Sequence, residues 1–112
     1  MTYELGEIIA IRELSLIDES GVGRRVEVRI GKPTQFPDST DYYAPFQITG
    51  IGSEKVLCAG GVDALQALQG VMVVVGAQLQ ALNSQHGGRL RWEGDSTGGF
   101  GFPDVTAPQL ER

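Results

Sequence analysis

The stretch that decides the fold runs from residue 64 to residue 88 and reads ALQALQGVMVVVGAQLQALNSQHGG. It contains no Asp, Glu, Lys or Arg, and its apolar residues recur at helical spacing, which predicts one long amphipathic helix. Asp63 is a good N-cap, because its carboxylate can accept hydrogen bonds from free amides of the first turn, and Gln66 can complete a capping box. The helix should end near Ser84, before Gly87 and Gly88. It would have about 22 residues and be roughly 33 Å long.

The two faces of this helix carry different kinds of residue. One stripe holds large apolar side chains and should face a sheet: Leu65, Leu68, Val71, Met72, Val75, Leu79 and Leu82. The opposite face is small and uncharged, whereas a helix face in water normally carries Lys, Glu or Arg. Its members are Gln66, Gly70, Val73, Val74, Ala77, Ala81 and Ser84. We therefore expect this second face to be covered.

A second copy of the chain is the simplest cover, since one sheet can hide only one side of a helix. We predict that the homodimer interface is formed by small residues of this face: Gly70, Val73, Val74, Ala77 and Ala81. The alternatives are that the C-terminal tail folds back over the face through Phe100, Phe102 and Val105, or that the uncharged face is simply exposed to water.

The rest of the chain predicts strands separated by turns. Apolar and charged residues alternate between Arg24 and Lys32, which indicates a strand with one buried and one wet face. Further strands are expected within residues 3–17, 41–52, 55–59 and 90–93. Glu13 breaks the alternation of the first, which we interpret as a bulge. Pro45 predicts that its strand is an edge strand or is bulged, because proline cannot donate to a ladder.

These elements predict an α+β fold, in which one long helix packs across one face of an antiparallel sheet of four or five strands. The length of 112 residues suits one domain. We assign this domain to residues 1–94 and expect an irregular C-terminal tail over residues 95–112, which are rich in Gly, Pro, Ser and Thr.

The charge balance excludes some partners. The chain has 9 basic and 14 acidic residues and a net charge of −5, which argues against nucleic acid or an anionic membrane surface, because both need a basic footprint. The sequence shows neither the pattern of a signal peptide nor about 18 consecutive apolar residues. We therefore expect a cytoplasmic protein without a membrane partner.

Residues that carry chemistry are few. Cys58 and His86 are the single residues of their types, and the predicted helix separates them, so we predict no Cys–His nucleophile pair. No cluster suggests a metal site, and we predict no catalytic residue and no cofactor. Aromatic and arginine side chains on the sheet are the candidate binding residues: Tyr42, Tyr43, Phe46, Arg29, Arg91 and Trp92. Core packing and a solvated charged face are the plainer interpretations of the same residues.

Four segments carry recognisable motifs: Arg24–Lys32, DYYAPFQI at Asp41–Ile48, GVDALQAL at Gly61–Leu68 and GRLRW at Gly88–Trp92. Together they resemble a family of small bacterial proteins of unknown function. The resemblance covers about residues 23–103 and implies a bacterial, cytoplasmic protein. It carries over no activity, cofactor or catalytic residue.

Two functions stay open at this point. The leading one is a non-enzymatic protein-interaction module that acts as a homodimer and binds another protein through the open face or an edge of its sheet. The alternative is a small-ligand binder or weak enzyme with a pocket near Tyr43, Cys58 and Trp92.

Overall fold

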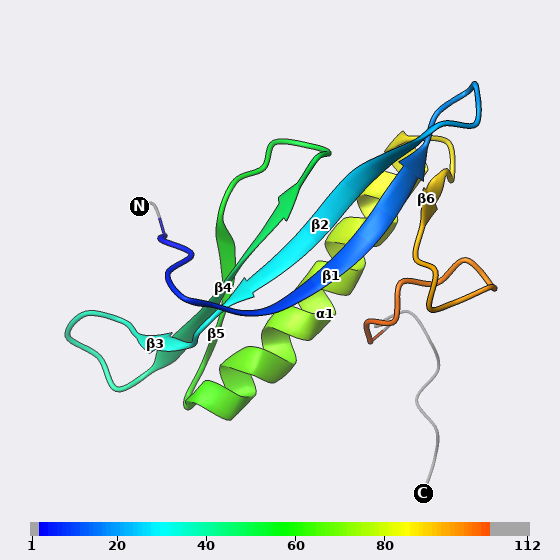
Figure 1. Ribbon diagram of the computed structural model, residues 1–112. Coiled ribbons are helices and arrows are strands. Elements are labelled where there is room, and N and C mark those ends of the chain that lie inside the picture. Colours follow the sequence, from blue (N-terminus) through cyan, green and yellow to red (C-terminus); the bar gives the residue numbers. More distant parts are fainter. Residues whose placement is uncertain (1–2, 104–112) are drawn as a thin grey trace, which may run out of the picture.

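The computed structural model describes residues 3–103 and has an α+β fold, which confirms the predicted class. The helix α1 (Ala64–Gln85) packs against one antiparallel sheet that does not close on itself (Figure 1). The strands are β1 (Ile8–Ile17), β2 (Gly23–Gly31), β3 (Thr34–Gln35), β4 (Tyr42–Thr49), β5 (Leu57–Gly61) and β6 (Leu90–Arg91). The sheet has more strands than expected, because the predicted loop after β2 contributes β3, which pairs with β4.

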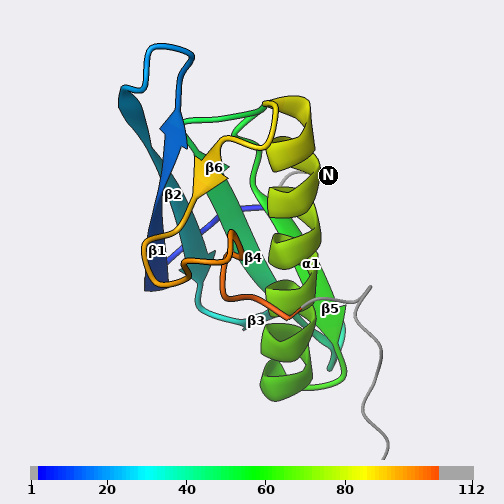
Figure 2. The same cartoon turned by 90° about the vertical axis from the view of Figure 1, so that its right-hand side faces the viewer.

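The first strands form an antiparallel meander, and the last strand, β6, comes back to pair with β1. β1, β2, β4 and β5 pair antiparallel in succession, and β3 continues the line of β2 along β4. The chain then passes along one face of the sheet as α1, which Figure 2 shows beside the strands. β6 pairs with β1 at the edge opposite β5.

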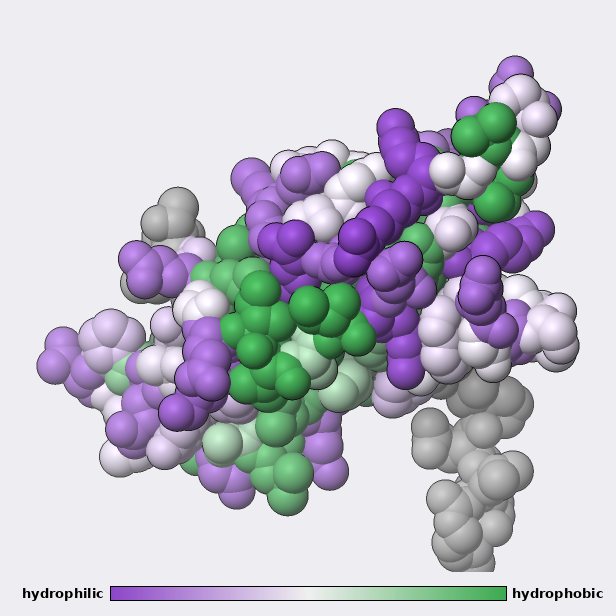
Figure 3. Space-filling view, viewed as in Figure 1, coloured by the Kyte–Doolittle hydropathy of each residue, from purple (hydrophilic) through white to green (hydrophobic). Residues whose placement is uncertain are grey.

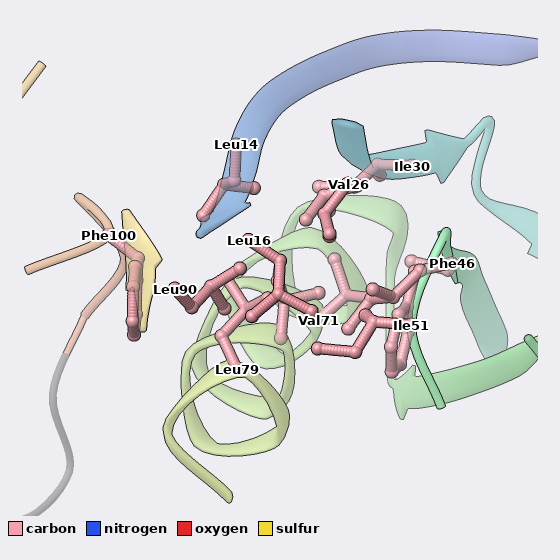
Figure 4. Packing of buried hydrophobic residues seen from close by; sticks show 14 of the residues in the cluster. Leu14, Leu16, Val26, Ile30, Phe46, Ile51, Val71, Leu79, Leu90 and Phe100 are labelled. Atoms are coloured by element: carbon pink, nitrogen blue, oxygen red, sulfur yellow. The ribbon is translucent and has the colours of Figure 1, made fainter. Parts of the chain in front are cut away.

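The core lies between α1 and the sheet face turned toward it. Alternate strand residues and one stripe of the helix fill it, including Leu14, Leu16, Val26, Val28, Ile30, Phe46, Ile48, Val71, Val75 and Leu79 (Figure 4). Burying each large apolar side chain is worth roughly 1.5–3 kcal/mol before entropy is subtracted. The alternation predicted for residues 24–32 is therefore the alternation that places β2 in the core.

Local hydrogen bonds fix both ends of α1 as the sequence predicts. The Asp63 carboxylate accepts from the Gln66 amide at 2.8 Å, and the Gln66 side-chain oxygen accepts from the Val62 amide at 2.7 Å. At the other end, the Gly88 amide donates to the Asn83 carbonyl at 2.8 Å, with Gly88 in the left-handed region at φ +74°.

The face that α1 turns to the sheet differs from the predicted stripe at its start. Leu65, which we expected in the core, is 67% exposed, and Ala67 is buried instead. The reason is a close approach of backbones: a side chain at Gly61 would collide with the Ala67 amide. Where the end of β5 meets the helix, there is room only for a small side chain, which is that of Ala67. Leu65 lies beside this contact and is exposed.

One local prediction for the strands was wrong, and one was right in part. The bulge in β1 lies between Ile8 and Ala10, not at Glu13, and the pairing from Ala10 onward is regular. β4 is an inner strand and not an edge, but its ladder is irregular at Pro45, which was the other alternative. On the β2 side, the ladder of β2 stops at Phe46 and that of β3 starts at Tyr43 with a shift of one residue, so Pro45 lies opposite a gap in the ladder.

The two ends of the described chain pack on opposite faces of the sheet. Leu5 crosses the outer face, the one turned away from α1, where a side chain at Gly31 would collide with its carbonyl. Residues 92–103 form turns and bends without a helix or strand, and Phe100 is only 7% exposed in the core. Val105 lies outside the described residues.

By length and composition alone, α1 is apolar enough to cross a membrane, and it is the one such helix in residues 3–103. A helix in the core of a soluble protein passes the same test, and α1 presses one side onto the sheet. The absence of a membrane partner therefore stays a prediction.

Candidate functional site

The most unusual surface of the molecule is the first part of β1. Ile8, Ile9, Ala10 and Ile11 are consecutive and all exposed; the three isoleucines are 40%, 46% and 57% exposed respectively. They lie on an edge of the sheet, because β2 pairs with one side of β1 and β6 pairs only with Ser15 and Leu16 on the other side. We refer to Ile8–Ile11 as the open edge.

Backbone groups at this edge are also open. The Ile17 amide donates to the Arg89 carbonyl, which shows that Ile17 directs its backbone groups toward the β6 side. Since backbone direction alternates along an antiparallel strand, Ile11 and Glu13 direct their amides and carbonyls to the same side. Among residues 3–103, no hydrogen-bond partner reaches those groups. They are therefore free to pair with a further strand.

Apolar surface continues from the open edge toward α1. Figure 3 shows a green patch over the start of β1 that extends to the N-terminal part of the helix, where Leu65 is exposed. Between the two elements lies a pocket of about 210 Å³, whose apolar lining includes Ile11, Met72 and Phe102. An incoming strand would thus meet both open backbone groups and a hollow for an apolar side chain.

Arg12 is the charged residue at the end of the apolar patch on β1, and it contacts the C-terminal tail. Its guanidinium carbon lies 3.9 Å from the ring centroid of Trp92 and 4.9 Å from that of Phe102, and its Nη1 donates to the Phe100 carbonyl at 3.0 Å. Gly101 allows this packing, because a side chain there would collide with the Trp92 ring and with Arg12. The charge of Arg12 is therefore held against aromatic rings beside the open edge.

On the outer face, charges neutralise one another. The buried Glu27 carboxylate accepts from Arg29 Nε at 2.5 Å and from Arg25 Nη2 at 2.7 Å, and Arg25 also lies 3.2 Å from Glu13. The hydrogen bond from Arg29 is the main reason that the pKa of Glu27 is lowered, although burial opposes it. In this network the negative charge of Glu13, next to the open edge, is balanced by the guanidinium of Arg25.

The pocket predicted near Tyr43, Cys58 and Trp92 is not formed. Tyr43 and Cys58 lie on the outer face of neighbouring strands, where the ring centroid of Tyr43 is 5.3 Å from that of Tyr3. A hydrogen bond with Cys58 raises the pKa of Tyr3. Trp92 follows β6 at the far edge of the sheet and packs against Arg12. The prediction failed because β6 pairs with β1 and not with β5.

The other predicted binding residues are also dispersed. Phe46 is 1% exposed and belongs to the core, and Tyr42 is half-buried against it. Arg29 holds Glu27, and Arg91 donates to the Leu90 carbonyl at 2.8 Å. The structure therefore does not gather the predicted set into one surface.

The residues of the predicted interface on α1 lie in two different environments: some pack inside the protein, and others are exposed to water. Gly70 and Val74 lie toward β5 or the core, since a side chain at Gly70 would contact Ala59. Val73 is half-buried, whereas Ala77 and Ala81 are exposed. The uncharged outer face of α1 is thus narrower than expected, and no described segment covers its exposed residues Gln66, Gln69, Ala77, Gln80, Ala81 and Ser84.

The tail packs on a flank of α1. Phe102 lies against Gly76, where an added Cβ would be 3.1 Å from that of Phe102. Phe100 belongs to the core cluster, and Figure 4 shows it beside β6, next to Leu90. The tail residues that can be described therefore leave Ala77 and Ala81 open.

Another open pocket, of about 430 Å³, lies where the β1–β2 turn meets the end of α1. It has a mixed lining, in which Arg89 lies 3.7 Å from Glu19 and His86 Nδ1 is 2.9 Å from the Leu82 carbonyl. Within the described part of the chain, no three His, Cys, Asp or Glu side chains gather to hold a metal ion.

Sequence comparison adds a family to this geometry. Residues 10–104 match DUF6968, a domain of unknown function. The chain belongs to the DUF6968 family. No curated protein and no solved structure matches significantly. The DUF6968 domain extends from Ala10 in β1 past the end of the described tail, and its uncharacterised status agrees with the resemblance noted in the sequence.

Sequence reasoning missed the open edge. The signal was present, since Ile8–Ile11 is a run of four apolar residues in a segment where a half-buried strand should alternate. What the sequence did not show is that β6 has only two residues and leaves this part of β1 uncovered.

Proposed function

We propose that this protein is a non-enzymatic protein-interaction module that acts as a homodimer and binds through the open edge of its sheet. One observation carries the proposal: Ile8–Ile11 is an exposed apolar run on a sheet edge, where the outward-facing backbone groups of Ile11 and Glu13 have no hydrogen-bond partner among residues 3–103.

The cost of leaving an apolar sheet edge exposed to water supports this proposal. An uncovered apolar edge invites pairing with any other chain, and proteins usually protect such edges with charges, proline or a covering segment. Here the bulge at Ile9 distorts the start of the edge, and charged residues adjoin the run only at its ends, Glu7 before it and Arg12, which is held against Trp92, after it. A regular partner strand would remove both the apolar exposure and the open hydrogen-bonding groups.

The remaining surface suits binding better than catalysis. The ionised groups of the outer face are paired with one another, and Cys58 and His86 lie on different elements of the fold. A bacterial and cytoplasmic setting, proposed from the resemblance of the motifs, is consistent with the acidic net charge of −5.

The test compares wild type with Ile11→Lys, using Val22→Lys as the matched control. Val22 is 62% exposed in the turn after β1, so its substitution adds the same charge at another exposed apolar position. We expect Ile11→Lys to weaken association, measured by sedimentation and by capture of bacterial proteins on the full chain, while Val22→Lys leaves it unchanged. Circular dichroism checks that each variant folds. Equal behaviour of all three proteins in both assays would refute the proposal.

A further inference from the structure

We infer that the hollow between the β1–β2 turn and the end of α1 binds a small monocarboxylate that carries a short apolar chain. This hollow, which we refer to as the hairpin pocket, has a volume of about 430 Å³ and is lined by residues 16–19, Arg24, residues 85–87 and Arg89. It lies at the opposite end of β1 from the open edge. The inference therefore goes beyond the proposed function and does not depend on it.

The pocket exists because the helix is shorter than the hairpin beside it. α1 ends at Gln85, whereas the β1–β2 turn projects beyond the last turn of the helix (Figure 1). Gly87 and Gly88, at φ +67° and +74°, then turn the chain back toward β6. The end of the hairpin is thus left without a helix over it. The hollow that results falls within the range of about 300–1,000 Å³ that is typical of small-molecule sites.

Arg24 supplies the cation of the pocket. It lies directly opposite Leu16 in the ladder of β1 and β2, so both side chains lie on the face turned to α1. The same row of β2 continues into the core as Val26 and Val28, which are buried. Within residues 3–103, no carboxylate forms an ion pair with Arg24. Its planar guanidinium is therefore free to bind a carboxylate through two parallel hydrogen bonds.

The other charges at the pocket favour a ligand with one negative charge. Asp18 uses one carboxylate oxygen to accept from the amides of Ser20 and Val22, each at 2.9 Å. Glu19 lies 3.7 Å from Arg89, so the charges of this pair compensate each other. A monocarboxylate would neutralise the remaining guanidinium, whereas a phosphate dianion would meet Asp18 and Glu19 with no second free arginine or lysine among the described lining residues. The net charge of −5 also disfavours ligands of higher negative charge.

The groups beside Arg24 define the rest of the ligand. Leu16 is 8% exposed and Ile17 follows it in β1, so this wall of the pocket offers a contact for a short hydrocarbon chain. On the helix side, His86 Nδ1 is 2.9 Å from the Leu82 carbonyl. Because a carbonyl oxygen only accepts, Nδ1 carries the hydrogen, and this bond orients the ring. The imidazole therefore borders the pocket and, as the single histidine, reports on binding there.

Titration of the full chain with sodium hexanoate, followed by the NMR signals of the His86 ring and the Gly87 amide, tests the inference. Two matched probes separate the features of the ligand at constant pH and ionic strength: sodium phosphate has the charge without the chain, and 1-hexanol has the chain without the charge. We expect saturable shifts with hexanoate, and an affinity at least about 10-fold higher than for either other probe.

Variants of the two ends of β2 identify the cation. Arg24→Gln should lower the affinity for hexanoate by at least about 10-fold, because the charged hydrogen bonds are lost. Lys32→Gln removes the same charge just past the far end of β2, at an exposed residue, and should leave the affinity unchanged. Arg24→Lys keeps the charge without the planar fork and should bind with intermediate affinity. Circular dichroism checks that each variant folds.

Three results would overturn the inference. Shifts that rise linearly without saturation would show that hexanoate has no site, and equal binding of 1-hexanol would show an apolar hollow only. An equal loss of affinity in Arg24→Gln and Lys32→Gln would show that overall charge, and not the hairpin pocket, attracts the anion. Ile11→Lys should not change hexanoate binding. Failure of the carboxylate site therefore leaves the interaction module standing, and failure of the module leaves the site standing.

Discussion

The two halves of β1 have similar apolar content but opposite surroundings. Ile8–Ile11 is exposed throughout, whereas in Leu14–Ile17 two of the residues, Leu14 and Leu16, are buried. Both halves pair with β2, and only the second half also pairs with β6. The two-residue strand β6 thus covers the second half of β1 and leaves the first half as a free sheet edge, with which a partner strand could pair. The difference shows that the amount of apolar sequence does not decide what a strand contacts.

The two halves of β1 should differ most in how much stability the protein loses when one side chain in each half is truncated. Leu14→Ala should lower the free energy of unfolding by about 2–5 kcal/mol, because Leu14 is 2% exposed and its loss leaves a cavity. Ile11→Ala should cost the isolated chain under about 1 kcal/mol, because more than half of its surface is already exposed. Urea unfolding at low protein concentration measures both. Equal losses would contradict the division of β1.

The tail that borders the open edge gives the next largest effect. Gly101→Ala should destabilise the chain by about 1–3 kcal/mol, because Gly101 has φ +78° and a side chain there collides with Trp92 and Arg12. Since Trp92 is the single tryptophan, its fluorescence reports the change in packing. An unaltered emission spectrum together with wild-type stability would show that the tail is not held by this contact.

The boundary between the halves gives a smaller, pH-dependent effect. Glu13 and Glu27 are directly opposite in the ladder, and the pKa of Glu27 is held below its ordinary value near 4.5 chiefly by Arg29. A lowered pKa in the folded state contributes stability that is present above the ordinary value and is lost as pH falls through the folded value. Between pH 7 and pH 3, wild type should therefore lose more stability than Glu27→Gln. Parallel profiles in thermal unfolding would argue against this contribution.

Much of the fold was predictable, because its signals are local. The N-cap at Asp63 and the end of α1 near Gly88 depend on neighbouring residues and were found as predicted. In β2 the predicted apolar face is buried, but Glu27 on the face predicted to be wet is buried as well, where it is held by Arg25 and Arg29. The burial of Ala67 in place of Leu65 was not, because it depends on how closely Gly61 approaches the helix.

The candidate site depended on long-range pairing that the sequence did not show. Trp92 was expected near Tyr43, but β6 pairs with β1 at the other edge of the sheet. For the same reason, the open edge could not be recognised from Ile8–Ile11 alone: its exposure follows from where β6 begins and ends. Residues distant in sequence decided both outcomes.

Amide hydrogen exchange of Ile11, followed by NMR over a range of concentrations of the full chain, tests the central claim most directly. If two copies associate through the open edge, exchange at this amide slows as concentration rises and is fast when the chains separate on dilution. Fast exchange at every concentration, in a chain whose mass increases to that of a dimer, would show that the copies meet elsewhere and would contradict the account.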